Sequence, residues 1–162
     1  MRLRSVLCAA VLLVASGCGT WQGIKDNDAQ FSLVTNAVHQ GARMATFTLL
    51  VRDEAETKIA LRIETGTGAA VKILEVLIAG SGEVGDLGVL WDSIDVHMDE
   101  EIQPYVGVGL TIAVGYLSAA IEEAGKLDKK DLAVMQAAFA GVRDGAKDYQ
   151  LLVPAQEKES DP

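Results

Sequence analysis

The stretch "AAVKILEVLIAGSGEVG", residues 69–85, decides the fold class of this chain. Its second half, from Gly80 to Gly85, has the G-x-G-x-x-G spacing of a dinucleotide-binding loop, which requires a β-strand before it and a helix after it. Before the loop, apolar residues instead recur at helical steps of three and four: Ala70, Ile73, Leu74, Leu77 and Ile78. We therefore expect a turn between two helices, with Gly80 as a C-cap, and no bound dinucleotide.

Upstream of this stretch, helical spacing extends back almost to the N-terminal region. We expect Asn27 or Asp28 to cap a helix. Its apolar positions are Phe31, Val34, Val38, Ala42 and Ala45. Residues 58–64 allow two interpretations, because three apolar residues alternate as in a strand while the intervening charges and alanines favour a helix. We expect a helix there, followed by a break at "TGTG", residues 65–68.

Downstream, the same periodicity continues to residue 153. Apolar residues recur at steps of three and four at Leu87, Leu90, Trp91, Ile94, Met98 and Ile102. Pro104 suits the first turn of a further helix. Residues 128–153 carry one apolar face: Leu132, Met135, Ala138 or Phe139, and Val142. The sequence thus predicts an all-α fold, a bundle of about four or five helices.

The segment "YVGVGLTIAVGYLSAAI", residues 105–121, contains no charged residue. Small side chains recur every fourth position along it, at Gly107, Thr111, Gly115 and Ala119. Such a stripe lets another helix approach closely. One interpretation is a membrane-spanning helix, although 17 residues are fewer than the roughly 20 that a span needs. We expect the other, a central helix buried in the bundle, with the stripe as its packing surface.

The first residues have the organisation of an export signal. Arg2 and Arg4 form a basic start, residues 6–14 form an apolar run, and small residues 15–17 precede Cys18. The apolar run is too short to cross a bilayer comfortably. We therefore expect a signal peptide over residues 1–17 that is removed from the mature protein.

The residues "ASGC" followed by glycine resemble the lipobox of bacterial lipoproteins. The resemblance covers about twenty residues and implies that Cys18 is acylated and becomes the first residue of the mature chain. Gly19 follows it, and in enteric-type sorting an Asp there retains lipoproteins at the inner membrane, so the resemblance implies the outer membrane, facing the periplasm. Ala15 stands where the family usually has Leu. Ala15 and Gly17 also suit ordinary signal cleavage, which remains the alternative.

Composition is compatible with an exported, anchored protein. Cys8 lies in the signal, so Cys18 is the only cysteine of the mature chain, which cannot form an internal disulfide. The full chain has 14 basic and 23 acidic residues. Removing residues 1–17 removes two of the basic ones, which leaves 12 against 23 and a net charge of −11. Such a domain is repelled by nucleic acid, and we expect no nucleic-acid partner.

Three further parts follow the signal peptide. Residues 18–27 suit a lipidated tether, in which Trp21 either rests at the lipid interface or packs on the domain. Residues 28–153 form the helical domain. The polar residues 154–162 are expected to be a disordered tail.

Candidate chemical sites are few. Asp92, Asp95 and Asp99 share a helix face and could hold a hard cation, but a solvated face is the preferred interpretation. His39 and His97 are expected at the surface, because neither has a plausible Ser or Cys partner nearby in the sequence. No H-E-x-x-H, C-x-x-C or G-x-S-x-G motif occurs. We therefore expect no catalytic residues, no metal and no cofactor.

These observations predict a non-catalytic envelope lipoprotein. It would be held at the membrane by the lipid on Cys18 and would act by contacting another macromolecule, as yet an unknown envelope protein. One alternative is a helical binding module that holds an apolar small molecule or lipid between its helices. Another is a membrane-active protein, for instance phage-encoded, that inserts residues 105–121.

Overall fold

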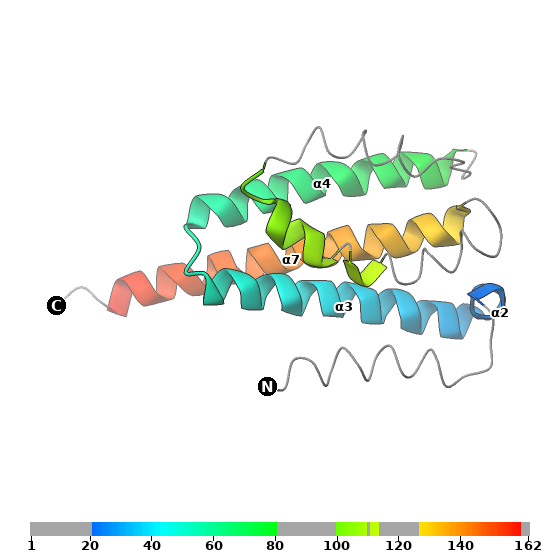
Figure 1. Cartoon of the computed structure of the whole chain (residues 1–162), viewed down its shortest axis with the longest axis horizontal. Helices are drawn as coiled ribbons and strands as arrows, with labels where there is room; N and C mark the ends of the chain where they lie inside the picture. Colours follow the sequence, from blue (N-terminus) through cyan, green and yellow to red (C-terminus); the bar gives the residue numbers. More distant parts are fainter. Residues whose placement is uncertain (1–20, 81–99, 110, 114–126, 160–162) are drawn as a thin grey trace.

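The computed structural model describes residues 21–80, 100–109, 111–113 and 127–159, with side chains up to residue 153, and these form a helical bundle (Figure 1). No β-sheet occurs within those ranges. The main helices are α2 (Trp21–Asp26), α3 (Asp28–Arg52), α4 (Thr57–Ala79) and α7 (Lys129–Glu159). A shorter helical run covers residues 103–109 and 111–113. The predicted all-α bundle is confirmed, but residues 154–159 of the expected disordered tail continue helix α7.

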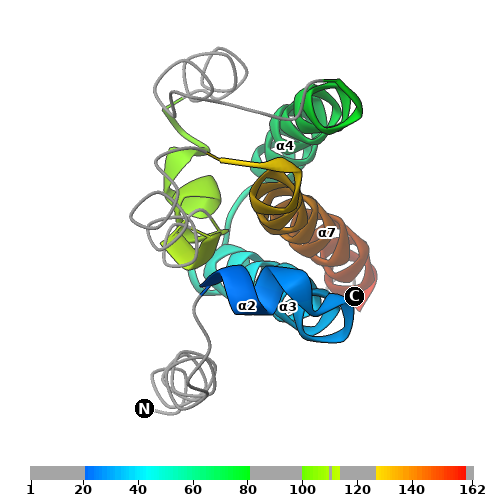
Figure 2. The ribbon, with the colours of Figure 1, turned by 90° about the vertical axis from the view of Figure 1, so that its right-hand side faces the viewer.

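Helix α7 is the central element of the described bundle. It packs along both α3 and α4, whereas contact between α3 and α4 is slight, and Figure 2 shows α7 between the two. The buried side chains of all three helices join one apolar core, to which α7 contributes the largest fully buried side chain, Phe139. The arrangement of the other helices therefore depends on their contacts with α7.

Helix α3 begins and packs as its sequence predicts. Asn27 is its N-cap, and its side-chain oxygen accepts a hydrogen bond from the Gln30 amide at 3.1 Å. The buried residues then recur every fourth position: Val34, Val38, Ala42, Thr46 and Leu50. The predicted last apolar position, Ala45, is only half-buried, because the buried face continues in steps of four through Thr46.

Helix α4 is continuous where a break is expected. Residues 58–64 are helical, as predicted, but the break at 65–68 is wrong. Gly66 and Thr67 are buried, and the Thr67 hydroxyl donates to the Ile63 carbonyl at 2.6 Å. A mid-helix glycine costs about 1 kcal/mol relative to alanine, and packing along α7 outweighs this local preference.

The glycine-rich loop follows a helix and not a strand. Helix α4 ends at Ala79, and the Gly80 amide donates to the Val76 carbonyl at 3.0 Å, so the predicted C-cap is confirmed. The βαβ context that a dinucleotide loop requires is therefore missing on the upstream side. Residues 81–85 lie outside the described part of the chain, as do Asp92, Asp95, Asp99 and His97.

The folded domain begins earlier than the sequence predicts. Residues 18–27 are expected to be a tether, but Trp21 to Asp26 form helix α2, which packs on the start of α3. Trp21 is only 4% exposed, so it packs on the domain, the second of the two positions considered for it. Six residues are too few to show a helical period, so the sequence pattern does not predict this helix.

The prediction that the stripe of small residues is a packing surface is wrong at the two positions that the structure describes, Gly107 and Thr111. A Cβ atom on Gly107 would meet nothing within 4 Å, and Thr111 is exposed, with its hydroxyl donating to the Gly107 carbonyl at 2.8 Å. The buried face of this run consists instead of Ile102, Val106, Gly109 and Ala113. Gly115 and Ala119 lie outside the described residues. Among the helices described, none is both long enough and apolar enough to span a membrane.

Glycines of α7 provide the close helix contact instead. A Cβ on Gly141 would collide with the His39 carbonyl oxygen and lie 2.9 Å from the Ala42 Cβ. A Cβ on Gly145 would collide with the Arg43 carbonyl oxygen in the same way. The G-x-x-x-G spacing of "GVRDG" therefore brings the backbones of α3 and α7 into direct contact.

Gly141→Ala should reduce the free energy of unfolding by about 1–3 kcal/mol or more, because its Cβ has no room against α3. Gly68→Ala, in the interior of α4, is the matched control. Nothing lies within 4 Å of its Cβ, so it should raise stability by up to about 1 kcal/mol through helix propensity. Urea unfolding followed by circular dichroism measures both. Equal stability of the parent and Gly141→Ala would contradict the close backbone contact.

Candidate functional site

The most deeply buried polar cluster lies at the start of α7, where two aspartates cap the helix. Asp128 Oδ1 accepts hydrogen bonds from the amides of Lys130 and Asp131 at 2.8 and 3.0 Å. Asp131 Oδ2 in turn accepts from the Asp128 amide at 2.8 Å. This reciprocal arrangement is a capping box, here with Asp at both positions. It fixes the Asp131 carboxylate in the core, where the side chain is fully buried.

The buried carboxylate binds two side chains of α2. Trp21 Nε1 donates to Asp131 Oδ1 at 2.7 Å, and Lys25 Nζ lies 3.2 Å from Asp131 Oδ2. Lys25 also reaches Asp128 Oδ2 at 2.8 Å and is only 4% exposed. We call Trp21, Lys25, Asp128 and Asp131 the α2 lock. It joins two segments more than 100 residues apart in the sequence.

The charges of the lock stabilise one another. Burial acts to lower the pKa of Lys25, but its two carboxylate partners outweigh burial and raise it above its usual value. Burial likewise acts to raise the pKa of Asp128, but the Lys25 ammonium and the capping amides lower it on balance. Both groups therefore stay charged at neutral pH.

Lys130 covers the lock from the solvent side. Its Nζ lies 2.8 Å from Asp28 Oδ1 and 5.1 Å from the centre of the Phe31 ring, and it donates to the Lys25 carbonyl oxygen. The cation therefore interacts with a carboxylate, an aromatic face and a backbone acceptor together. These contacts connect α2, the first turn of α3 and the first turn of α7.

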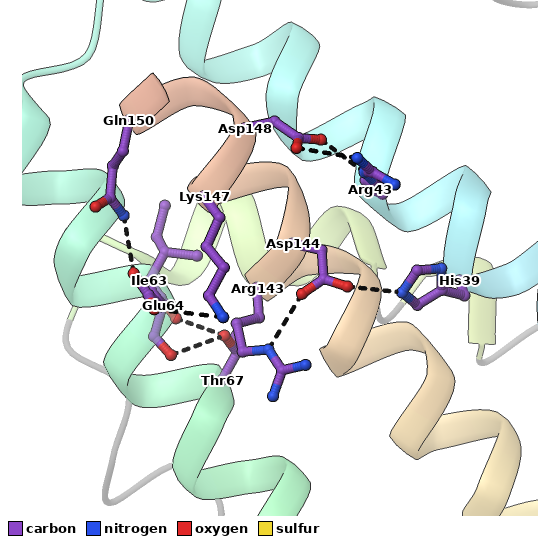
Figure 3. Close-up of polar contacts among 10 residues, drawn as sticks. All are labelled: His39, Arg43, Ile63, Glu64, Thr67, Arg143, Asp144, Lys147, Asp148 and Gln150. Carbon is purple, nitrogen blue, oxygen red and sulfur yellow. Dashed lines mark hydrogen bonds and ion pairs between the residues drawn. The ribbon is translucent and has the colours of Figure 1, made fainter. Parts of the chain in front are cut away.

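A second set of charges follows the contact between α3 and α7 (Figure 3). His39 Nε2 lies 3.1 Å from Asp144 Oδ2, and Arg43 makes a two-pronged pair with Asp148 at 2.6 and 3.0 Å. The members of each helix are four residues apart, so the two pairs are one turn apart. We call these four residues the α3–α7 ladder. They flank the contact made by Gly141 and Gly145.

The ladder shifts the pKa values of its charged groups. The Asp148 carboxylate raises the pKa of the Arg43 guanidinium. Burial acts to raise the pKa of Asp144, but His39 and Arg143 lower it on balance. Arg143 lies 3.3 Å from Asp144, so this carboxylate has one partner on α3, His39, and a second on α7 itself.

The other side of α7 makes a smaller polar contact with α4. Glu64 Oε1 lies 3.6 Å from Lys147 Nζ, and Glu64 Oε2 accepts a hydrogen bond from Gln150 at 3.1 Å (Figure 3). Polar side chains of α7 therefore bind α3 on one side and α4 on the other. Each of these contacts positions a helix.

The arrangement is suited to holding helices in register. His39 is not an isolated surface histidine, because it is half-buried against Asp144, and that aspartate is also bound by Arg143. Within the described ranges, no group of three His, Cys, Asp or Glu side chains could hold a metal ion. The backbone contact at Gly141 also leaves no room for an apolar ligand between α3 and α7 there.

Several of these features have a sequence signal that is separate from the apolar periodicity. Asp-x-x-Asp before an apolar run marks the capping box at Asp128, and G-x-x-x-G marks the contact at Gly141. The partners of these motifs, Trp21 and His39, have no such signal. Cys18 lies outside the described residues.

Comparisons with known proteins provide no relative from which a function could be transferred. No protein-family model, no curated protein and no solved structure matches this chain. The site is therefore interpreted from its own geometry.

Lys25→Met should reduce the free energy of unfolding by about 3–5 kcal/mol, because it leaves the Asp131 carboxylate buried without its cation. Adding Asp131→Asn should recover part of this loss, since the buried charge is then removed. Recovery should be incomplete, because the single amide oxygen of Asn can accept from Trp21 but not also from the Asp128 amide. Lys58→Met is the control: its pair with Glu56 is exposed, so little change is expected. Urea unfolding of the four proteins tests this. A double variant no more stable than Lys25→Met would contradict it.

Acid should destabilise the domain through the carboxylates whose pKa is lowered on folding, including Asp128 and Asp144. A carboxylate with a lowered folded-state pKa stabilises the protein above its unfolded pKa of about 3.9, and this stabilisation is lost as pH falls through the folded pKa. The free energy of unfolding should therefore decline from about pH 5 downward. Asp144→Asn should make the decline shallower. Identical slopes for both proteins, from urea unfolding at a series of pH values, would contradict a role for Asp144.

Proposed function

We propose that this chain is a lipid-anchored envelope protein that has no catalytic activity and acts by contacting another macromolecule. The observation that carries the proposal is the order of the first eighteen residues: a basic start, a short apolar run, small residues and Cys18. By resemblance to bacterial lipoproteins, Cys18 is acylated and the chain lies at the outer membrane, facing the periplasm. Two or more acyl chains give stable anchoring.

Features of the folded domain support this proposal. The charged side chains of the α2 lock pair with one another, and those of the α3–α7 ladder also pair with one another. Their described contacts therefore hold helices together. The outward side of α3 exposes three large apolar side chains, Leu33, Met44 and Val51. They are spaced by eleven and seven residues, three and two helical turns, and so follow one line along the helix. This line is a surface through which a macromolecule could be contacted.

Cys18→Ser should abolish incorporation of labelled fatty acid and shift the protein from the membrane fraction to the soluble fraction. The reason is that the thiol is the acceptor of the acyl group in the family that the signal resembles. Cys8→Ser is the matched control: the residue lies within the signal, so labelling and membrane association should not change. Metabolic labelling followed by fractionation measures both.

Membrane retention of Cys18→Ser without label would contradict the lipid anchor. It would favour the membrane-inserting alternative for residues 105–121. If the parent protein takes up no labelled fatty acid, and the signal peptide is nevertheless removed from the parent and from both variants, ordinary signal cleavage without lipidation would be favoured.

A further inference from the structure

The position of the α2 lock limits where the proposed anchor can attach to the domain. Resting on the acylation of Cys18 proposed above, we propose that the lock holds the α2 end of the bundle against the lipid headgroups. The domain then stands on the bilayer in one orientation, with the turn at residues 53–56 directed away from it. The partner of this surface is the lipid bilayer itself.

The connection between Cys18 and the folded domain is short. Three peptide units separate Cys18 from Trp21, and consecutive Cα atoms are 3.80 Å apart, so the two Cα atoms can be at most about 11 Å apart. Trp21 is already buried in the domain. The acylated residue therefore has no long flexible linker, whatever path the intervening residues take.

The lock attaches Trp21 firmly to the domain. Its indole donates to a fully buried carboxylate, and the same carboxylate binds Lys25 one helical turn later. Lys130 adds a bond to the Lys25 carbonyl oxygen and a pair with Asp28. Helix α2 is thus held by side chains and by backbone, and buried groups of this kind are costly to leave without partners.

The proposed anchor lies near one end of the bundle. Helix α2 lies beside the starts of α3 and α7, and Figure 1 shows the end of α4 at the same end of the molecule. The turn at residues 53–56 lies at the other end, where the Tyr149 hydroxyl donates to the Ala55 carbonyl at 2.6 Å. Helix α3 connects the two ends and, with 25 residues, is about 37 Å long. An anchor within about 11 Å of Trp21 therefore lies much closer to one end than to the other.

The orientation can be tested with the acylated protein purified from membranes and inserted into phosphatidylcholine vesicles that carry a nitroxide on some headgroups. Zwitterionic lipid avoids repulsion of the acidic domain. A single cysteine for a fluorescent label is introduced either near the lock, as Gln30→Cys, or at the opposite turn, as Glu56→Cys; both side chains are exposed. Acylated Cys18 does not react with the label. Quenching by the nitroxide should be severalfold stronger at residue 30 than at residue 56.

Two variants separate the lock from the length of the connection. Trp21→Ala removes the indole and keeps the length, whereas a twelve-residue Gly-Ser insertion between Thr20 and Trp21 keeps the lock and lengthens the connection. Each should bring the quenching at residue 30 close to that at residue 56. The insertion leaves every described contact in place, so it remains informative if Trp21→Ala fails to fold.

The outcomes distinguish this inference from the proposed function. Equal quenching at the two positions of the anchored parent, or stronger quenching at residue 56, would overturn the orientation and leave the anchor intact. An unchanged difference after the insertion would also overturn it. A parent chain that carries no acyl group and does not float with vesicles would instead overturn the proposed function.

Discussion

The direct backbone contact between α3 and α7 is the constraint on which the rest of the described structure depends. Gly141 and Gly145 remove the side chains that would otherwise separate the two helices. Helix axes usually lie 8–10 Å apart, and small residues allow the shorter end of that range or less. The close approach also sets the register in which His39 and Arg43 meet Asp144 and Asp148. The ladder therefore follows from the glycines, since exposed or half-buried ion pairs alone stabilise little.

A second constraint operates at the first turn of α7. Asp131 takes part in the capping of its own helix and binds Trp21 and Lys25 of α2. One buried carboxylate thus connects helix initiation with the position of the N-terminal segment. This connection would limit the distance between the proposed anchor and the domain, because Cys18, the proposed acylation site, lies only three residues before Trp21.

The sequence predicts the helical class well, because apolar spacing depends on neighbours along the chain. The helix at residues 28–52 follows from such spacing, and so do the two halves of the helix at residues 57–79, although the sequence predicts a break between those halves. The roles of individual glycines cannot be predicted from apolar spacing, because each role depends on the atoms that face the glycine in the folded structure. Gly68 and Gly107 face open space, whereas Gly141 faces the backbone of α3. Spacing of small residues by four occurs at both Gly107 and Gly141, so that pattern alone does not distinguish a close contact from open space. Helix α2 is missed because it is short and because Asp131, the partner of Trp21, lies 110 residues away.

Hydrogen exchange in the native state tests most directly whether α3 and α7 depend on one another. The amides around residues 38–46 of α3 and 138–146 of α7 flank the glycine contact. If that contact holds the bundle together, both sets should exchange only through global unfolding, with the same opening free energy and the same dependence on denaturant. Exchange of either set through a separate opening of clearly lower free energy would show that the helices are stable independently and would contradict the account.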